Sequence, residues 1–231
     1  MAKKKNQAAK DLEQVNQALG RAEQFIENNQ KNLLIGLAVI ILLVIAGLGI
    51  YYGYLAPRER EAENKIYQGQ LYFEQDSLQL ALKGDGMKYI GFEEISRQYK
   101  HTKTGKLAAA YAGIIYYRLG DQAKALDLLK KFSPGDNMID PSIAGLIGDC
   151  YIDAGKVSEA IRYFEEGAKK ADNALVSPYL LKKAAAAYES EGKYDAALKN
   201  YQTIKDKYFQ SQQAADIDKY IEKIRLTTAE K

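Results

Sequence analysis

The sequence has no tryptophan, one cysteine, one histidine and four prolines in 231 residues. The single cysteine, Cys150, excludes an internal disulfide. The single histidine, His101, lies in a segment rich in lysine and threonine with no second ligand or nucleophile beside it, which indicates a surface residue. Scarce proline together with 47% apolar residues is typical of an all-helical chain.

Catalytic constellations are also absent from the sequence. Cys150 lies inside a predicted helix, which favours a small buried apolar residue over a reactive thiol. The Gly84-Asp85-Gly86 segment lacks the lysine and the flanking strand of a phosphate-binding loop. Adjacent acidic residues such as Glu93 and Glu94 diverge on a helix, as on a solvated face. The sequence therefore predicts a noncatalytic protein with no cofactor, no bound metal and no small-molecule substrate.

A strong excess of charge of one sign is missing. The net charge is +3. Residues 1–32 carry six basic and four acidic side chains, and residues 57–231 carry 27 basic and 26 acidic ones. A nearly neutral domain does not indicate binding to nucleic acid or to an acidic substrate.

Polar side chains are absent from one long run, Leu33–Tyr52, which contains no charge, no amide and no proline. Its first 18 residues are Leu, Ile, Val, Ala or Gly, and 13 of them are Leu, Ile or Val. About 20 apolar helical residues span the roughly 30 Å of a bilayer core, and these residues favour insertion by roughly −4 to −8 kcal/mol. A buried core helix would show a polar stripe. We therefore predict a transmembrane helix over residues 33–55.

A cleaved signal peptide is the alternative for this run. Its apolar region would span about 7–15 residues behind a short basic start. Here a polar segment of 32 residues comes first and the apolar run is longer, so an uncleaved anchor is favoured. Gly49 and Gly53, four residues apart, would let another transmembrane helix approach closely, although glycine is also common in spans without such a contact.

The flanks of the run predict its orientation. The tail, residues 1–32, holds six Lys or Arg residues, whereas Arg58, Arg60 and Lys65 follow the run. A short basic tail favours a cytoplasmic N-terminus and a periplasmic C-terminal domain, and a reversed topology stays open. The far end of the run carries a tyrosine cluster typical of a membrane interface, formed by Tyr51, Tyr52 and Tyr54.

The tail contains one apolar stripe. Its residues recur at alternating spacings of three and four, which predicts an amphipathic helix. Such a helix would lie on the membrane surface or pair with a partner helix, and a solvated lead-in is the alternative. The stripe is formed by Leu12, Val15, Leu19, Ala22 and Ile26.

The sequence of residues 57–105 predicts a long helix followed by a degenerate first repeat. Pro57 suits the first turn of a helix, and Arg58–Lys83 is expected to form one long helix. The Gly84-Asp85-Gly86 turn ends it. A second helix follows through Phe92, Ile95 and Tyr99 and closes near His101–Gly105.

From Lys106 to Lys231 the chain is periodic. Ala125, Ala160 and Ala197 are 35 and 37 residues apart. In each copy a pair of small or aliphatic residues precedes a tyrosine by three positions, and a glycine follows that tyrosine by four, except that copy three has Ala185 in place of the first glycine. The copies are Ala112-Gly113, Tyr116 and Gly120; Ile147-Gly148, Tyr151 and Gly155; and Ala184-Ala185, Tyr188 and Gly192.

This spacing resembles the tetratricopeptide repeat, a helix–turn–helix unit of about 34 residues. Small residues let the two helices approach closely, and the glycine after the first helix ends it because glycine adopts the left-handed cap conformation cheaply. Pro141 and Pro178 suit the first turn of the next pair. The tryptophan usual in the family is replaced by Ala109, Ala144 and Leu181.

A capping helix is expected to close the last repeat, because a solenoid needs a polar outer face at its open end. The fold prediction is thus all-α: a transmembrane helix, three repeats and a cap. The apolar side of the predicted cap is formed by Ala214, Ala215, Ile217, Ile221 and Ile224.

The resemblance implies a concave surface lined by four positions of each first helix. Several of these residues are small or apolar, which suits an extended or helical polypeptide; packing of the groove against Arg58–Lys83 is the alternative. The lysine and asparagine that would grip a C-terminal carboxylate are missing. The candidate residues are Leu107, Ala110, Ile114 and Tyr117; Ser142, Gly145, Asp149 and Ile152; and Tyr179, Lys182, Ala186 and Glu189.

The layout of a short tail, one span and a small repeat domain resembles the YfgM-like family of bacterial inner-membrane proteins. That resemblance implies a periplasmic accessory subunit of the SecYEG translocon that works with periplasmic chaperones on emerging client polypeptides. The repeat motifs do not specify the translocon. An assembly subunit of another envelope secretion or motility complex, or a cytosol-facing peptide receptor, remains an alternative.

Overall fold

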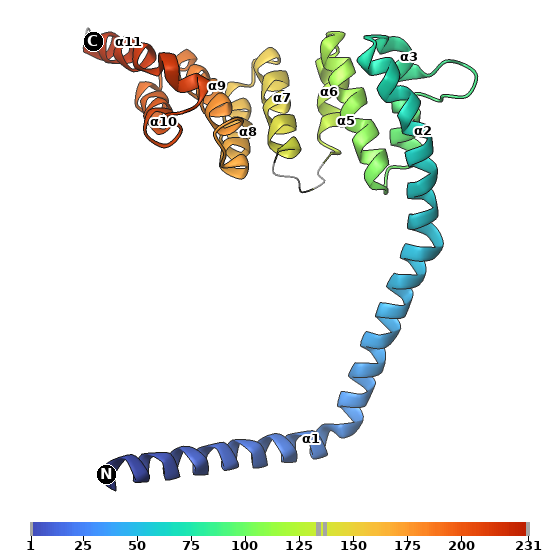
Figure 1. The fold of residues 1–231 in the computed structure, drawn as a ribbon, viewed down its shortest axis with the longest axis vertical. Helices are drawn as coiled ribbons and strands as arrows, with labels where there is room; N and C mark the ends of the chain where they lie inside the picture. Colours follow the sequence, from blue (N-terminus) through green and yellow to red (C-terminus); the bar gives the residue numbers. More distant parts are fainter. Residues whose placement is uncertain (1, 133–134, 136–137, 230–231) are drawn as a thin grey trace. The chain divides into compact units, whose positions relative to one another are not determined.

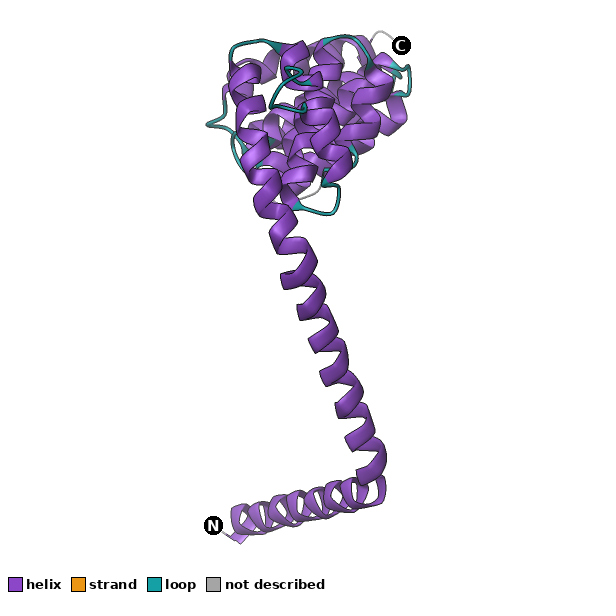
Figure 2. Cartoon of the chain, turned by 90° about the vertical axis from the view of Figure 1, so that its right-hand side faces the viewer, coloured by secondary structure: helices purple, strands orange, loops and turns teal. Residues whose placement is uncertain are grey.

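The computed structural model describes residues 2–132, 135 and 138–229. These residues form helices joined by turns and loops, and none of them lies in a strand (Figures 1 and 2). The chain divides into two compact units, Met1–Pro57 and Arg58–Lys231. The all-helical class is therefore confirmed over the described residues.

The first unit is dominated by one helix. Helix α1 covers Ala2–Ile50, and a π-helical turn, η1, covers Tyr51–Leu55. By length and composition one helical stretch, Glu27–Glu74, suffices to cross a membrane: its most apolar window has a mean hydropathy of 3.1 and none of that window is buried. A Cβ atom added at Gly49 or Gly53 would meet nothing within 4 Å. The side chains of the predicted tail stripe lie outside the described residues.

The second unit opens with three helices instead of one long helix and a short one. They are α2 (Ala56–Glu74), α3 (Leu78–Lys83) and α4 (Phe92–Gln98). The predicted continuous helix Arg58–Lys83 is wrong, because Asp76 takes a left-handed conformation with φ of 58°. The Ser77 amide then donates to the carbonyl of Tyr72, which closes a glycine-free Schellman turn. Aspartate is among the few residues that tolerate this conformation.

The Gly84-Asp85-Gly86 turn is confirmed. Gly84 and Gly86 have φ of 95° and 74°. The Asp85 carboxylate accepts hydrogen bonds from the amides of Met87, Lys88 and Tyr89 at 2.9, 3.0 and 3.0 Å. These hydrogen bonds, the one from Met87 first, lower the pKa of Asp85. The carboxylate therefore fixes the loop that leads into α4.

Three helical hairpins follow, as the repeat spacing predicts (Figure 1). Gly120, Gly155 and Gly192 end the first helices with φ of 84°, 70° and 71°, so the predicted glycine caps are confirmed. Pro141 and Pro178 lie in the first turns of their helices, also as predicted. The pairs are α5 (Lys103–Arg118) with α6 (Gln122–Leu129), α7 (Ile139–Asp153) with α8 (Val157–Ala171), and α9 (Ser177–Ser190) with α10 (Tyr194–Lys207).

The cap consists of a 3₁₀ turn, η2 (Gln212–Asp216), and helix α11 (Ile217–Ala229). Ile217, Ile221 and Ile224 are each 2% exposed, so the predicted apolar side is confirmed for the helix. Ala214 and Ala215 lie in the turn that precedes the helix, and Ala215 is exposed. The cap therefore buries its three isoleucines against the last pair.

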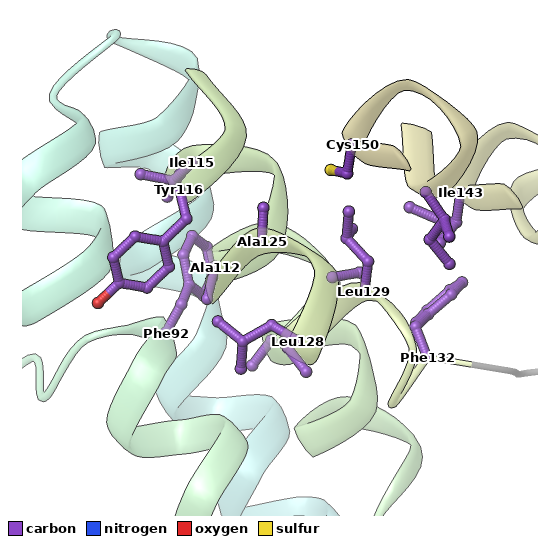
Figure 3. Packing of buried hydrophobic residues seen from close by; sticks show 14 of the residues in the cluster. Phe92, Ala112, Ile115, Tyr116, Ala125, Leu128, Leu129, Phe132, Ile143 and Cys150 are labelled. Atoms are coloured by element: carbon purple, nitrogen blue, oxygen red, sulfur yellow. The ribbon is translucent and has the colours of Figure 1, made fainter. Parts of the chain in front are cut away.

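The two helices of a pair approach each other closely at a glycine, which has no side chain. A Cβ atom on Gly113 would lie 2.7 Å from Cγ of Leu129, and one on Gly148 would lie 2.7 Å from Cδ1 of Phe164 and closer still to Cε1. Successive pairs interlock as well: Figure 3 shows Leu129 and Phe132 pointing toward α7. All the described buried apolar residues lie between Ala62 and Ile224, so the second unit contains its own core.

We predict that Gly148→Leu destabilises the second unit, because Phe164 is only 1% exposed and cannot move aside. The expected loss is about 3 kcal/mol, the upper part of the range for overpacking, although leucine favours helix more than glycine does. Urea unfolding of the Arg58–Lys231 unit measures it. Ala186→Leu, an added side chain at an exposed position of α9, is the control and should be neutral. Equal midpoints for the two variants would contradict the packing.

Candidate peptide-binding surface

The predicted groove residues lie on the first helices of the three pairs, and ten of the twelve have some exposed surface. On α5, Leu107, Ile114 and Tyr117 are half-buried and Ala110 is buried. On α7, Ser142 and Ile152 are exposed, Asp149 is half-buried and Gly145 is buried. On α9, Tyr179 and Ala186 are exposed, and Lys182 and Glu189 are half-buried.

Ala110 and Gly145 serve packing within the domain. Ala110 belongs to the main core cluster at 3% exposure. Gly145 accommodates Leu180 of the next pair, since a Cβ atom there would lie 2.7 Å from Cδ2 of Leu180. Gly167 faces the same leucine, and its added Cβ atom would lie 2.8 Å from Cδ1. Gly145 and Gly167 thus form a socket for Leu180. Ala110 and Gly145 are both buried, so neither lies on an open surface.

Helix α2 packs beside the candidate surface on another face of α5. The Glu59 carboxylate accepts hydrogen bonds from the amide and the hydroxyl of Thr104 at 3.0 and 2.8 Å. The ring of Phe73 meets that of Tyr111 edge-on, with centroids 5.2 Å apart. Arg118 forms an ion pair at 2.6 Å with Asp76, just after α2. Thr104, Tyr111 and Arg118 recur every seven residues and include none of the predicted groove residues.

One ion pair lies in the middle of the candidate surface. Lys183 of α9 donates to both carboxylate oxygens of Asp149 on α7, at 2.6 and 2.7 Å, with side chains 27% and 23% exposed. The ammonium group also lies 4.9 Å from the ring centroid of Tyr179. Burial opposes the charge on Lys183, but hydrogen bonds to Asp149 and Tyr179 outweigh it and raise the pKa. Burial, and next the charge of Asp149, raise the pKa of Tyr117.

Sequence reasoning missed the pairing of these charges. Asp149 and Lys183 are 34 residues apart, and the same separation joins Lys182 to Asp216 at 2.8 Å and Glu189 to Lys223 at 2.7 Å. The sequence signal that could have revealed these ion pairs is the presence of opposite charges 34 residues (about one repeat) apart on successive first helices. The cap thus engages Lys182 and Glu189, and Glu189 also accepts from the hydroxyl of Tyr201 at 2.7 Å.

We call the exposed and half-buried part of this surface, on the first helices α5, α7 and α9 of the three pairs, the A-helix strip. It surrounds the Asp149–Lys183 pair with aromatic and aliphatic side chains, and this chemistry suits a polypeptide with apolar residues and a few polar groups. The strip is formed by Leu107, Ile114, Tyr117, Ser142, Asp149, Ile152, Tyr179, Lys183 and Ala186.

The candidate catalytic residues are not gathered into a site. Cys150 is 1% exposed, and burial raises the pKa of its thiol to about 11, which keeps it protonated at neutral pH. His101 is exposed at a turn. Among the residues that the structure describes, no three His, Cys, Asp or Glu side chains are placed to hold a metal ion.

Two solved structures are similar to the chain, both with TM-scores below 0.5. The crystal structure of MamA has 16% identity, covers 70% of this chain and 95% of its own, and gives a TM-score of 0.47. A crystal structure of nearly identical TPR-like repeats, from a Podosopora anserina putative kinesin light chain (Q17M), has 14% identity, covers 78% and 99%, and gives 0.44. No family model and no curated protein matches the chain. The assignment of stacked hairpins rests on the helix bounds and packing described above.

We predict that Lys183→Met lowers the free energy of unfolding of the second unit by about 1–3 kcal/mol, because it leaves the half-buried Asp149 carboxylate without its charged donor. Urea unfolding measures the change. The control is Lys131→Met, which removes an ion pair to Asp127 whose side chains are 56% and 68% exposed. That variant should change stability by at most about 0.5 kcal/mol. Comparable losses in both variants would show that the central pair has no special role.

Proposed function

We propose that this chain is a noncatalytic scaffold, anchored in a bacterial inner membrane by residues 33–55, whose repeat domain binds other polypeptides in the periplasm. The resemblance to the YfgM-like family suggests SecYEG translocon subunits, periplasmic chaperones and client polypeptides as partners. The tail, residues 1–32, is cytoplasmic in this proposal. Anchoring raises the effective concentration of the domain toward partners at the membrane.

The exposure of the apolar run supports the anchor most directly. Its large side chains, Leu33 through Tyr54, are 44–69% exposed, and the buried apolar residues described all belong to the second unit. A helix with apolar side chains all round is stable where lipid or protein surrounds it. Gly49 and Gly53 leave one side of it free of bulky groups, which would suit a second transmembrane helix.

The A-helix strip supports the binding role. It combines exposed Tyr179 and Ile152 with the half-buried ring of Tyr117 around one ion pair. Aromatic residues held in place by packing contribute much of the binding energy at protein interfaces. The strip also runs across three successive pairs, which is the extent that an extended or helical segment requires.

Cysteine accessibility tests the topology. Lys199 is exposed on α10 and Gln24 is exposed in the tail. We expect an impermeant maleimide to label Lys199→Cys in intact cells and Gln24→Cys only after the membrane is permeabilised. Cys150 is a silent background because it is buried. Labelling in the opposite order would reverse the topology, and recovery of the chain in the soluble fraction would remove the anchor.

Crosslinking in native membranes, followed by mass spectrometry, tests the strip. The double variant Tyr117→Ala and Ile152→Ala should weaken capture of the crosslinked partner about tenfold or more, because it removes two anchors from one surface. Leu119→Ala is the matched control, since Leu119 is an exposed apolar residue of the same region outside the strip. Circular dichroism should show both proteins folded. Undiminished capture by the double variant would place partner binding elsewhere.

A further inference from the structure

A hollow lies between α9 and α11, at the C-terminal end of the repeat domain (Figure 1). Its volume is about 440 Å³. Helix α9 contributes Ala186 of the A-helix strip and Glu189 of the predicted groove, so the hollow is continuous with the candidate binding surface. Aromatic side chains supply much of the remaining wall, namely Tyr194 and Tyr201 of α10 and Tyr220 of α11.

A small residue keeps this junction open. Asp149 of α7 and Ala186 of α9 are 37 residues apart, which is the separation of the second and third repeats, so they occupy equivalent positions. At the junction of α7 with α9, Asp149 forms its ion pair with Lys183 at 2.6 Å. At the junction of α9 with α11, Ala186 is exposed and has no atoms beyond Cβ. The hollow therefore opens where the preceding junction carries a carboxylate.

The carboxylate at the hollow already has its partners. Glu189 accepts from the hydroxyl of Tyr201 with Oε1 and from the ammonium group of Lys223 with Oε2, both at 2.7 Å. The Glu189 side chain is 13% exposed, and its hydrogen bond raises the pKa of Lys223. An anionic guest would therefore lie beside a carboxylate, and it could pair with Lys223 only if the existing ion pair broke.

A cationic guest is disfavoured by Lys182. The ammonium group of Lys182 pairs with Asp216 at 2.8 Å and lies 4.4 Å from the ring centroid of Tyr220. One face of this tyrosine is thus occupied by a cation, and a second cation would be repelled at short range. Burying a charge without a partner is costly, whereas an apolar side chain gains free energy when it leaves water and contacts the tyrosine rings.

We propose that this hollow is a pocket for one large apolar side chain of the polypeptide that lies along the A-helix strip. We call it the α9–α11 pocket. This inference rests on the proposed binding function and deepens it, because it names the chemistry of one guest residue and the end of the strip at which that residue lies. A leucine, phenylalanine or tryptophan residue has this chemistry, and a segment with a charged residue at that place binds more weakly.

A tryptophan-containing peptide tests the pocket, because the chain has no tryptophan of its own. The reporter is an uncharged peptide of about 12 residues with blocked ends, in which two leucines and one tryptophan lie among serines and asparagines. The full chain is held in phosphatidylcholine nanodiscs, and the signal of empty nanodiscs is subtracted. We expect the tryptophan emission to shift to shorter wavelength on binding, because the indole ring leaves water.

Competing peptides measure the preference of the pocket. The peptide with phenylalanine in place of tryptophan should displace the reporter at a concentration at least about tenfold lower than the peptides with lysine or glutamate at that place. Equal competition by all three peptides would overturn the pocket and leave binding to the strip standing. Absence of any emission shift with the full chain would overturn the pocket together with the binding role of the strip.

Two variants narrow the pocket from different walls. Ala186→Leu on α9, which we expect to be neutral for stability, and Thr227→Leu on α11 should each weaken reporter binding at least about fivefold. Ala215→Leu is the matched control, since Ala215 is exposed and does not line the pocket. Circular dichroism should show all three proteins folded. Unchanged affinity in both narrowed variants would overturn the pocket.

Discussion

The repeat domain depends on one constraint, which is the close approach of the two helices of a pair at a glycine. Gly113 faces Leu129 and Gly148 faces Phe164, each at a separation that leaves no room for a methyl group. Because the side chains of Leu129 and Phe164 are fully buried and leave no room for an added atom, the packing specifies where each second helix crosses its partner. The third pair places Ala185, also fully buried, at the equivalent position, so a methyl group is accommodated between its two helices.

The pairs are joined by a different set of contacts. Leu180 fills a socket of two glycines from the preceding pair, and the Asp149–Lys183 ion pair spans the same junction on the open side. In a solenoid, stability is approximately the sum of repeat and junction terms, and this junction combines a packed and a polar contact. The cap repeats this arrangement with three buried isoleucines and with partners for Lys182 and Glu189.

The hairpins could be predicted from the sequence because glycine caps, small residues and a repeat of about 35 residues report on local geometry. The break at Asp76 could not, since it needs an aspartate in the left-handed conformation, which residues other than glycine adopt uncommonly. Family positions located the candidate surface, yet Ala110 and Gly145 turned out to be buried. A position in a repeat specifies direction on its own helix, whereas burial depends on the bulk of the neighbours, here Leu180 for Gly145.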